Sequence, residues 1–132
     1  MQARVERSTR TSKPRARRSP GGGPDTEAGG RLVRLVNDLG NNGVAELLGV
    51  SRSQPSRWRR GLEHMGPGNE RRVVDLDYLW TRLLLLFTPR QAEIWMTSYN
   101  AHLGARPVDV LRLRGAVPVV QAIDAEAQGA YV

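Results

Sequence analysis

The 132-residue chain has no cysteine, which excludes disulfide bonds, thiol catalysis and thiolate metal sites. Its two histidines, His64 and His102, fall in separate expected loops, and neither has a partner at metal-ligand spacing. The most apolar run, residues 83–87, is far shorter than the roughly 18 to 20 residues needed to cross a bilayer. The basic N-terminus lacks the apolar segment of a secretory signal. We therefore expect a cytoplasmic protein with no metal, cofactor or membrane partner.

Sequence signatures of common catalytic sites are also missing. The chain contains no HExxH, no glycine-rich phosphate loop, no GxSxG and no pair of carboxylates that stands out. Asp75 and Asp77 lie near the start of a long expected helix, where they are interpreted as partners of the helix dipole. These observations predict a binding protein and not an enzyme.

Negative charge is scarce in residues 1–24, which carry seven basic groups and one acidic group. The remaining residues carry 13 basic and 12 acidic groups, so most of the net charge of +7 belongs to this N-terminal segment. Its polar composition and Gly-Gly-Gly-Pro end predict a disordered basic tail. Three explanations of the tail stay open: a solvated extension, an arm that follows DNA phosphates, and a misassigned start codon.

The first predicted helix covers residues 25–39, with Asp25 or Thr26 as its cap. Gly29 and Gly30 each weaken a helix by roughly 1 kcal/mol relative to alanine, which favours an ordered start near Arg31. Residues 40–43, Gly-Asn-Asn-Gly, tolerate positive φ and predict a turn.

Residues 44–61 have the spacing of a helix-turn-helix. Ala45 is small where two helices would cross, and Gly49 provides a turn four residues later. Residues 51–54 fit a capping box for the second helix. The exposed side of this helix would carry side chains able to bond phosphates and base edges, namely Arg52, Ser53, Gln54, Ser56, Arg57 and Arg60. Operator DNA is therefore a second expected partner.

Pro55 departs from the helix-turn-helix pattern because it stands where an aliphatic core residue is usual. Proline is tolerated in the first turn of a helix but not in its interior. Either the second helix begins late, with Ser53 as its cap, or its first turn is distorted. Both possibilities weaken the prediction of sequence-specific DNA recognition without changing the predicted fold.

The longest predicted helix covers residues 70–87 and is apolar over much of its circumference. It is either the central core helix of a small bundle or the seam of a homodimer. Three further helix starts follow, at Thr88-Pro89, Arg106-Pro107 and Val117-Pro118, each with proline where a missing N–H costs little. The fold class is therefore an all-α small helical bundle.

The last half of the chain resembles the C-terminal domain of the MbcA/ParS/Xre antitoxins, most of all the mycobacterial MbcA branch. The residues that carry the resemblance are Arg90, Gln91, Ala92, Trp95, Met96, Ser98, Asn100, Leu103, Arg106, Pro107, Asp109, Leu111, Gly115, Val120, Ile123, Asp124, Gly129 and Val132. The resemblance implies an antitoxin of a type II toxin–antitoxin system. Its partner would be a RES-domain toxin, an enzyme that consumes NAD as a glycohydrolase or phosphorylase.

The resemblance also implies where the toxin would be bound. These antitoxins cover the NAD pocket of the toxin with their C-terminal end, which here is Gly129, Ala130, Tyr131 and Val132. Gly129 is expected to end the last helix and free the chain, and Tyr131 offers a flat ring with a polar tip. Without the resemblance, these residues would be interpreted as a frayed terminus. Asn100 and Arg106, which bracket a loop, are additional candidates for toxin binding.

The expected organisation is a tail (1–24), an Xre-like helix-turn-helix domain (25–62) and a toxin-binding domain (63–132). A different hypothesis is a stand-alone transcriptional regulator, in which the helix-turn-helix is the active part and the C-terminal region dimerises. A structural adaptor that binds no nucleic acid is a third, weaker hypothesis.

Overall fold

The computed structural model describes residues 23–129, and residues 1–22 and 130–132 lie outside the described part. Ala130, Tyr131 and Val132 therefore lie outside it, as do residues 1–22 of the predicted tail (1–24). The described chain is all-α, as expected, with six helices and no strand. The helices are α1 (Glu27–Leu48), α2 (Gln54–Arg59), α3 (Pro67–Leu83), α4 (Pro89–Thr97), α5 (Pro107–Arg114) and α6 (Ala116–Gly129).

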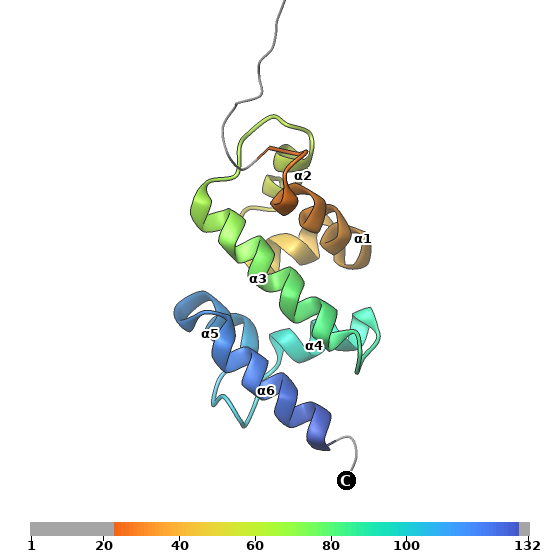
Figure 1. Ribbon diagram of the computed structural model, residues 1–132, viewed down its shortest axis with the longest axis vertical. Coiled ribbons are helices and arrows are strands. Elements are labelled where there is room, and N and C mark those ends of the chain that lie inside the picture. The colour runs from red at the N-terminus through yellow and green to blue at the C-terminus, as the bar shows by residue number, and fades with distance from the viewer. Residues whose placement is uncertain (1–22, 130–132) are drawn as a thin grey trace, which may run out of the picture.

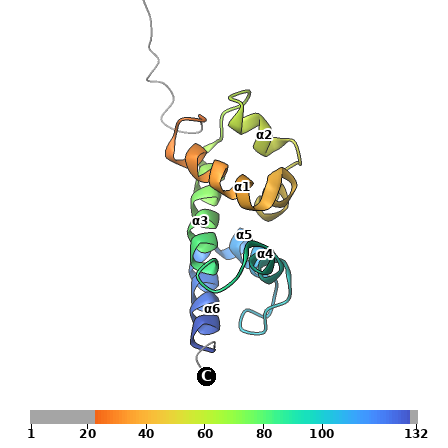
Figure 2. The same ribbon diagram turned by 90° about the vertical axis from the view of Figure 1, so that its right-hand side faces the viewer.

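Helix α3 runs along the length of the molecule and connects its two ends (Figures 1 and 2). Helices α1 and α2 lie beside its first half, and α4, α5 and α6 lie around its second half. In both views α2 and the end of α6 lie at opposite ends of the molecule. Helix α2 and the end of α6, which belong to the regions predicted to bind DNA and toxin, are therefore well separated.

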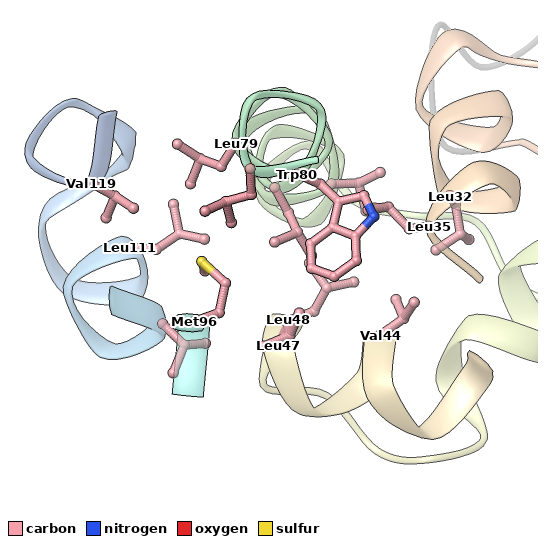
Figure 3. Close-up of a cluster of buried hydrophobic side chains, with 14 of the residues drawn as sticks. Leu32, Leu35, Val44, Leu47, Leu48, Leu79, Trp80, Met96, Leu111 and Val119 are labelled. Carbon is pink, nitrogen blue, oxygen red and sulfur yellow. The ribbon is translucent and has the colours of Figure 1, made fainter. Parts of the chain in front are cut away.

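One hydrophobic core extends through both halves of the described chain. Figure 3 shows Leu79 of α3 directed toward α5 and α6, and Trp80 directed toward the two parts of α1. The indole N–H of Trp80 is satisfied by Asp38, with Nε1 2.9 Å from the carboxylate oxygen. Most apolar residues of α3 are buried within one chain, so they need no second copy to cover them; they are Val73, Leu76, Leu79, Trp80 and Leu83. Tyr78 is exposed. Of the two roles predicted for this helix, its burial favours the central core helix of a small bundle.

Proline and capping residues set the starts of the C-terminal helices as predicted. At α4, the Thr88 hydroxyl accepts a hydrogen bond from the Gln91 backbone N–H, and the Gln91 side chain accepts one from the Thr88 N–H. This is the predicted capping box, with Pro89 at the first helical position. Helix α5 likewise begins at Pro107 and ends before Gly115, where φ is 85°.

The start of α1 confirms Thr26, one of the two predicted caps, and contradicts the late start expected near Arg31. The helix begins at Glu27, because Thr26 caps it by accepting a hydrogen bond from the Gly29 N–H at 3.1 Å. Gly29 is buried in the first turn, and a Cβ there would lie 2.5 Å from the carbonyl oxygen of Pro24. The glycine therefore allows the chain before the helix to pack closely against it, and the expected start near Arg31 was wrong.

The predicted turn at residues 40–43 is reduced to one residue. Gly40 alone has non-helical angles (φ 74°, ψ 167°), and the helix resumes at once and continues to Leu48. Gly43 is helical and buried, and a Cβ there would lie 3.2 Å from a carboxylate oxygen of Glu93. Glycine at this position lets the Glu93 side chain of α4 lie close to α1, and it does not form a turn.

Helix α3 is displaced toward the N-terminus from its predicted bounds of 70–87. It begins at Pro67, because Gly66-Pro67 supplies a helix start in a segment that was expected to be a loop. It ends at Leu83, and Leu85, expected in the apolar stripe, is 82% exposed. None of the helices in residues 23–129 has the length and apolar content that a bilayer crossing requires.

Candidate functional site

Two side-chain bonds fix the last helix, α6, to the rest of the molecule. Asp124 accepts a hydrogen bond from Arg82 of α3, with Nη2 2.5 Å from Oδ1. Glu126 accepts one from the indole of Trp95 of α4, with Nε1 3.0 Å from Oε1. The two bonds lie within six residues of Gly129 and attach α6 to two different helices. They hold the end of the described chain in a defined direction.

Gly129 does not end α6 in the way the sequence predicted. It is the last described residue and is still helical, and it is not among the glycines with positive φ. The expected left-handed C-terminal position was therefore wrong. A Cβ at Gly129 would meet nothing within 4 Å, so the position does not require glycine for space or for conformation. Ala130, Tyr131 and Val132 lie outside the described residues.

Asn100 organises the loop between α4 and α5. Its backbone N–H donates to the carbonyl oxygen of Ala105 at 3.0 Å, and its side-chain oxygen accepts from the N–H of Leu103 at 3.1 Å. Its carbonyl oxygen also accepts from the N–H of Gly104, at 2.7 Å. These bonds give Asn100 a local role in closing the loop, which the sequence does not reveal.

Arg106 is exposed at the N-terminus of α5, where its guanidinium binds Asp109. The Arg106 Nε lies 2.8 Å from one carboxylate oxygen of Asp109, and Nη2 lies 3.1 Å from the other. This two-point hydrogen bond lowers the pKa of Asp109 below its ordinary value. Both side chains remain at the surface, so Arg106 is accessible to a partner although it also pairs with Asp109.

A shallow hollow of about 240 Å³ brings two of the predicted toxin-binding residues together. It lies between the loop after α4 and the outer face of α6, and its lining residues are Asn100, Ala101, His102, Ala122, Ala125, Glu126 and Gly129. Asn100 and Gly129 thus share one surface, whereas Arg106 does not line it. The predicted toxin-binding residues divide into a pair at this hollow and a separate residue at the start of α5.

The second helix of the helix pair, α2, begins late, as one of the two predicted alternatives proposed. Ser53 is its N-cap residue, and Pro55 lies in its first turn. Pro55 is fully buried, so it fills the core position that an aliphatic residue usually takes. The predicted capping box at residues 51–54 is wrong, because the N-cap of α2 is Ser53 and not Ser51, and no side chain caps the helix.

The residues predicted to bind DNA are not equally available. Arg52, Ser53 and Arg60 are exposed, whereas Gln54, Ser56 and Arg57 are half-buried. The Arg57 guanidinium donates to Ser53 Oγ at 2.6 Å and to Gln54 Oε1 at 2.8 Å. Three of the six predicted residues are therefore bonded to one another.

A fourth residue, Glu63, completes this arrangement. Its Oε1 accepts a hydrogen bond from Arg57 Nε at 3.1 Å. Arg57, as the first cause, lowers the pKa of Glu63 below its ordinary value. Sequence reasoning missed Glu63, because it lies after α2 in a segment interpreted only as a loop. Its spacing of six residues from Arg57 gave no helical or strand signal.

Sequence reasoning also missed two other interactions, and both join distant segments. Asp77 is buried and lies 2.8 Å from Arg31 and 2.7 Å from Arg34, both on α1. It is in the middle of α3, so its expected role near the helix start was wrong. Arg112 of α5 donates to the carbonyl oxygen of Glu46 at the end of α1, which joins the C-terminal helices to the helix pair.

The described residues give little support for a metal or small-ligand site. No group of three His, Asp or Glu side chains is arranged as metal ligands within residues 23–129. A hollow of about 610 Å³ between α1 and α4 has the carboxylates of Glu46 and Glu93 and the guanidinium of Arg52 in its lining. A charged small molecule of either sign would meet a like charge there.

Comparison with known proteins gives consistent results for both the C-terminal region and the longer chain. Residues 82–129 match the family described as the antitoxin Xre/MbcA/ParS C-terminal toxin-binding domain. The mycobacterial cidal antitoxins MbcA of Mycobacterium bovis and Mycobacterium tuberculosis are each 31% identical over 90 residues. Each match covers 67% of this chain and 80% of the relative.

The fold is also similar to that of a chain in the crystal structure of the M. tuberculosis MbcT–MbcA toxin–antitoxin complex. The TM-score is 0.64 at 27% identity, and the match covers 81% of this chain and 99% of that chain. The similarity thus extends over nearly all of the described residues and includes helices before the matched C-terminal domain.

Proposed function

The chain belongs to the Xre/MbcA/ParS family of antitoxins, and from this premise we propose that it inhibits a RES-domain toxin by covering its NAD pocket. As a family member it is an antitoxin of a toxin–antitoxin system. The proposed inhibitory element is the C-terminal end, Gly129 to Val132. Asn100 and Arg106 are proposed to contribute to the surface around it.

The observation that carries the proposal is the way α6 is held. Val119, Ala122 and Ile123 of this helix are buried in the core. Its surface bonds to Arg82 and Trp95 add to this packing, and its end lies at one extremity of the molecule (Figure 1). A rigid support reduces the entropy lost when a short terminal segment enters a concave site. Since Gly129 is helical, the support extends to the first residue of the proposed inhibitory element.

The plug is tested by truncation after Gly129, which removes Ala130, Tyr131 and Val132 and leaves every described helix intact. The truncated and full-length proteins are each co-expressed with the cognate RES toxin, and cellular NAD is measured. We expect NAD loss with the truncated antitoxin and protection with the full chain. Copurification of the truncated protein with the toxin would show that the remaining surface still binds.

Two matched controls accompany the truncation. Removal of residues 1–22 should leave inhibition intact. The described chain begins at one end of the molecule, and α6 ends at the opposite end. The substitution Gly30→Ala should also preserve inhibition, since a Cβ there meets nothing within 4 Å and the residue is helical in α1. Full protection of NAD by the protein truncated after Gly129 would refute the plug.

A second proposed activity is autoregulation of the operon by binding of operator DNA. Helix α2 contains Arg57 and Arg59 and no acidic residue in its first turn. It lies at the end of the molecule away from α6 (Figure 2), where DNA and toxin would not compete for space. Backbone contacts from arginine supply affinity, whereas base contacts supply specificity.

Gel retardation of the protein's own promoter tests this activity, with Arg57→Ala as the variant. We expect binding by the full chain and weaker binding by the variant. The alternative function, a stand-alone regulator, predicts tight promoter binding without any copurifying toxin.

We also propose a cytoplasmic location and a homodimer within a larger toxin–antitoxin complex. Residues 25–62 are proposed to form the DNA-binding domain, and residues 63–132 the toxin-binding domain.

A further inference from the structure

We propose that Glu63 is an internal substitute for a DNA phosphate, which occupies Arg57 and limits the affinity of the α2 surface for DNA. The inference rests on the proposed DNA-binding function and concerns how that surface is regulated. Neither the family match nor the relatives assign a role to Glu63.

The geometry around Arg57 carries the first step. Its three guanidinium nitrogens each donate to a different side chain: Nη1 to Ser53 at 2.6 Å, Nη2 to Gln54 at 2.8 Å and Nε to Glu63 at 3.1 Å. Ser53 and Gln54 belong to the start of α2, so they orient the guanidinium from within the helix. Only Glu63 comes from outside this segment, and only it carries charge.

The chemistry of the partners carries the second step. A carboxylate and a phosphate present similar oxygens to the planar fork of arginine, and both bind it through charge-assisted hydrogen bonds. A phosphate that binds Arg57 on its Nε side therefore needs the position that Glu63 occupies. The carboxylate also repels the phosphate, because both are negative. DNA binding at Arg57 thus requires exchange of one anion for another.

The exposure of the pair makes this exchange possible. The side chains of Arg57 and Glu63 are 41% and 50% exposed. Ion pairs between exposed side chains contribute little to stability, so a phosphate can displace the carboxylate. Glu63 also lies beyond the end of α2, so its displacement breaks no bond within the helix.

The test measures binding of a fluorescent DNA duplex of about 20 base pairs, long enough for two turns of helix, to the full-length protein at low salt. Glu63→Gln removes the charge and keeps the size of the side chain. Glu70→Gln, at the start of α3, makes the same change in net charge at a residue not bonded to Arg57 and serves as the matched control. Both substitutions are also made in an Arg57→Ala background.

We expect Glu63→Gln to tighten DNA binding about threefold more than Glu70→Gln does, as an exposed pair of this kind permits. In the Arg57→Ala background the two substitutions should have equal effects, because Glu63 then has no guanidinium to occupy. A purely structural role of Glu63 would instead lower the melting temperature and would not depend on Arg57 in this way.

Equal effects of the two substitutions in the unsubstituted protein would overturn the role of Glu63 and leave DNA binding in place. Absence of DNA binding by every variant would overturn the proposed DNA-binding function, and the role of Glu63 with it. A direct check is independent of DNA: the pKa of Glu63, followed by NMR, should rise in Arg57→Ala. An unchanged value would show that the pair does not form in solution.

Discussion

Asp77 shows how much a single buried charge can determine in a small helical protein. It is the one buried charged residue among those the structure describes, and it receives hydrogen bonds from two arginines of α1. Burial of an unpaired carboxylate is strongly unfavourable, so the pairing is a condition for α1 to pack on α3 in this register. The interaction ties together residues more than 40 positions apart.

Replacement of Asp77 by alanine should destabilise the protein by about 1–3 kcal/mol, because two charge-assisted bonds are removed. The effect is limited, since Arg31 and Arg34 can turn toward solvent; their side chains are 27% and 61% exposed. Urea unfolding followed by far-UV circular dichroism measures the effect. The control is Asp75→Ala, whose ion pair with Arg71 is longer, at 3.7 Å, and lies at the surface. Equal effects of the two substitutions would contradict the role given to Asp77.

The sequence could not identify these residue pairs, although it identified the residue types. Asp77 was assigned to the helix dipole because α3 was expected to begin at residue 70; with the start at Pro67, it faces α1 from the middle of the helix. Glu63 and Arg112 act on partners on other elements. Such interactions depend on how helices pack, and helical periodicity carries no information on them.

At the scale of helices, the prediction succeeded where local chemistry decides and failed where packing decides. The starts of α4 and α5 follow from Thr88, Gln91 and two prolines, all of which act within one turn. Gly29, Gly43 and Gly129 were each expected to weaken or end a helix, and all three are helical. At Gly29 the backbone of Pro24 comes too close for any other residue, and at Gly43 the Glu93 side chain would have to shift to admit a Cβ.

Gly49 forms the joint between the helix pair and the C-terminal helices. It caps α1 with φ at 73°, and a Cβ there would lie 3.0 Å from the Nε of Arg112. The same guanidinium donates to the carbonyl oxygen of Glu46. The joint thus combines a left-handed residue with a close approach from α5.

Gly49→Ala should therefore cost about 2–3 kcal/mol, of which about 1–2 kcal/mol reflects the left-handed conformation. Gly104→Ala isolates the conformational part, since Gly104 has φ at 70° and nothing within 4 Å of the added Cβ. Thermal unfolding of both variants gives the comparison. If the two variants are equally destabilised, the packing of Arg112 on the joint contributes nothing to stability.

Over the whole molecule, the positive charge is concentrated in the N-terminal segment and not in the folded helices. The described helices and their connections are nearly neutral, and residues 1–22 hold seven basic groups and one acidic group. These residues precede Gly23-Pro24, and Pro24 lies beside Gly61 at the end of α2. The positive charge is therefore attached at the end of the molecule proposed to bind DNA and far from the end proposed to bind toxin.

Removal of residues 1–22 should weaken DNA binding and reduce its salt dependence. The slope of log K against log salt should fall in magnitude by about 0.9 for each phosphate that the shortened protein no longer neutralises. Fluorescence anisotropy with a labelled duplex over a salt series measures this slope. The melting temperature serves as the control and should not change, because all described helices are retained. An unchanged slope would assign the N-terminal charge a role other than DNA binding.

The shared core determines which substitutions can abolish DNA binding or toxin inhibition without affecting the other activity. Because α3 buries Leu79 on one side and Trp80 on the other, an alteration that loosens this helix disturbs the supports of α2 and α6 together (Figure 3). Selections for loss of one activity alone should therefore avoid the buried residues of α3. They should yield changes near Arg57 when repression fails and near Trp95 or beyond Gly129 when immunity fails.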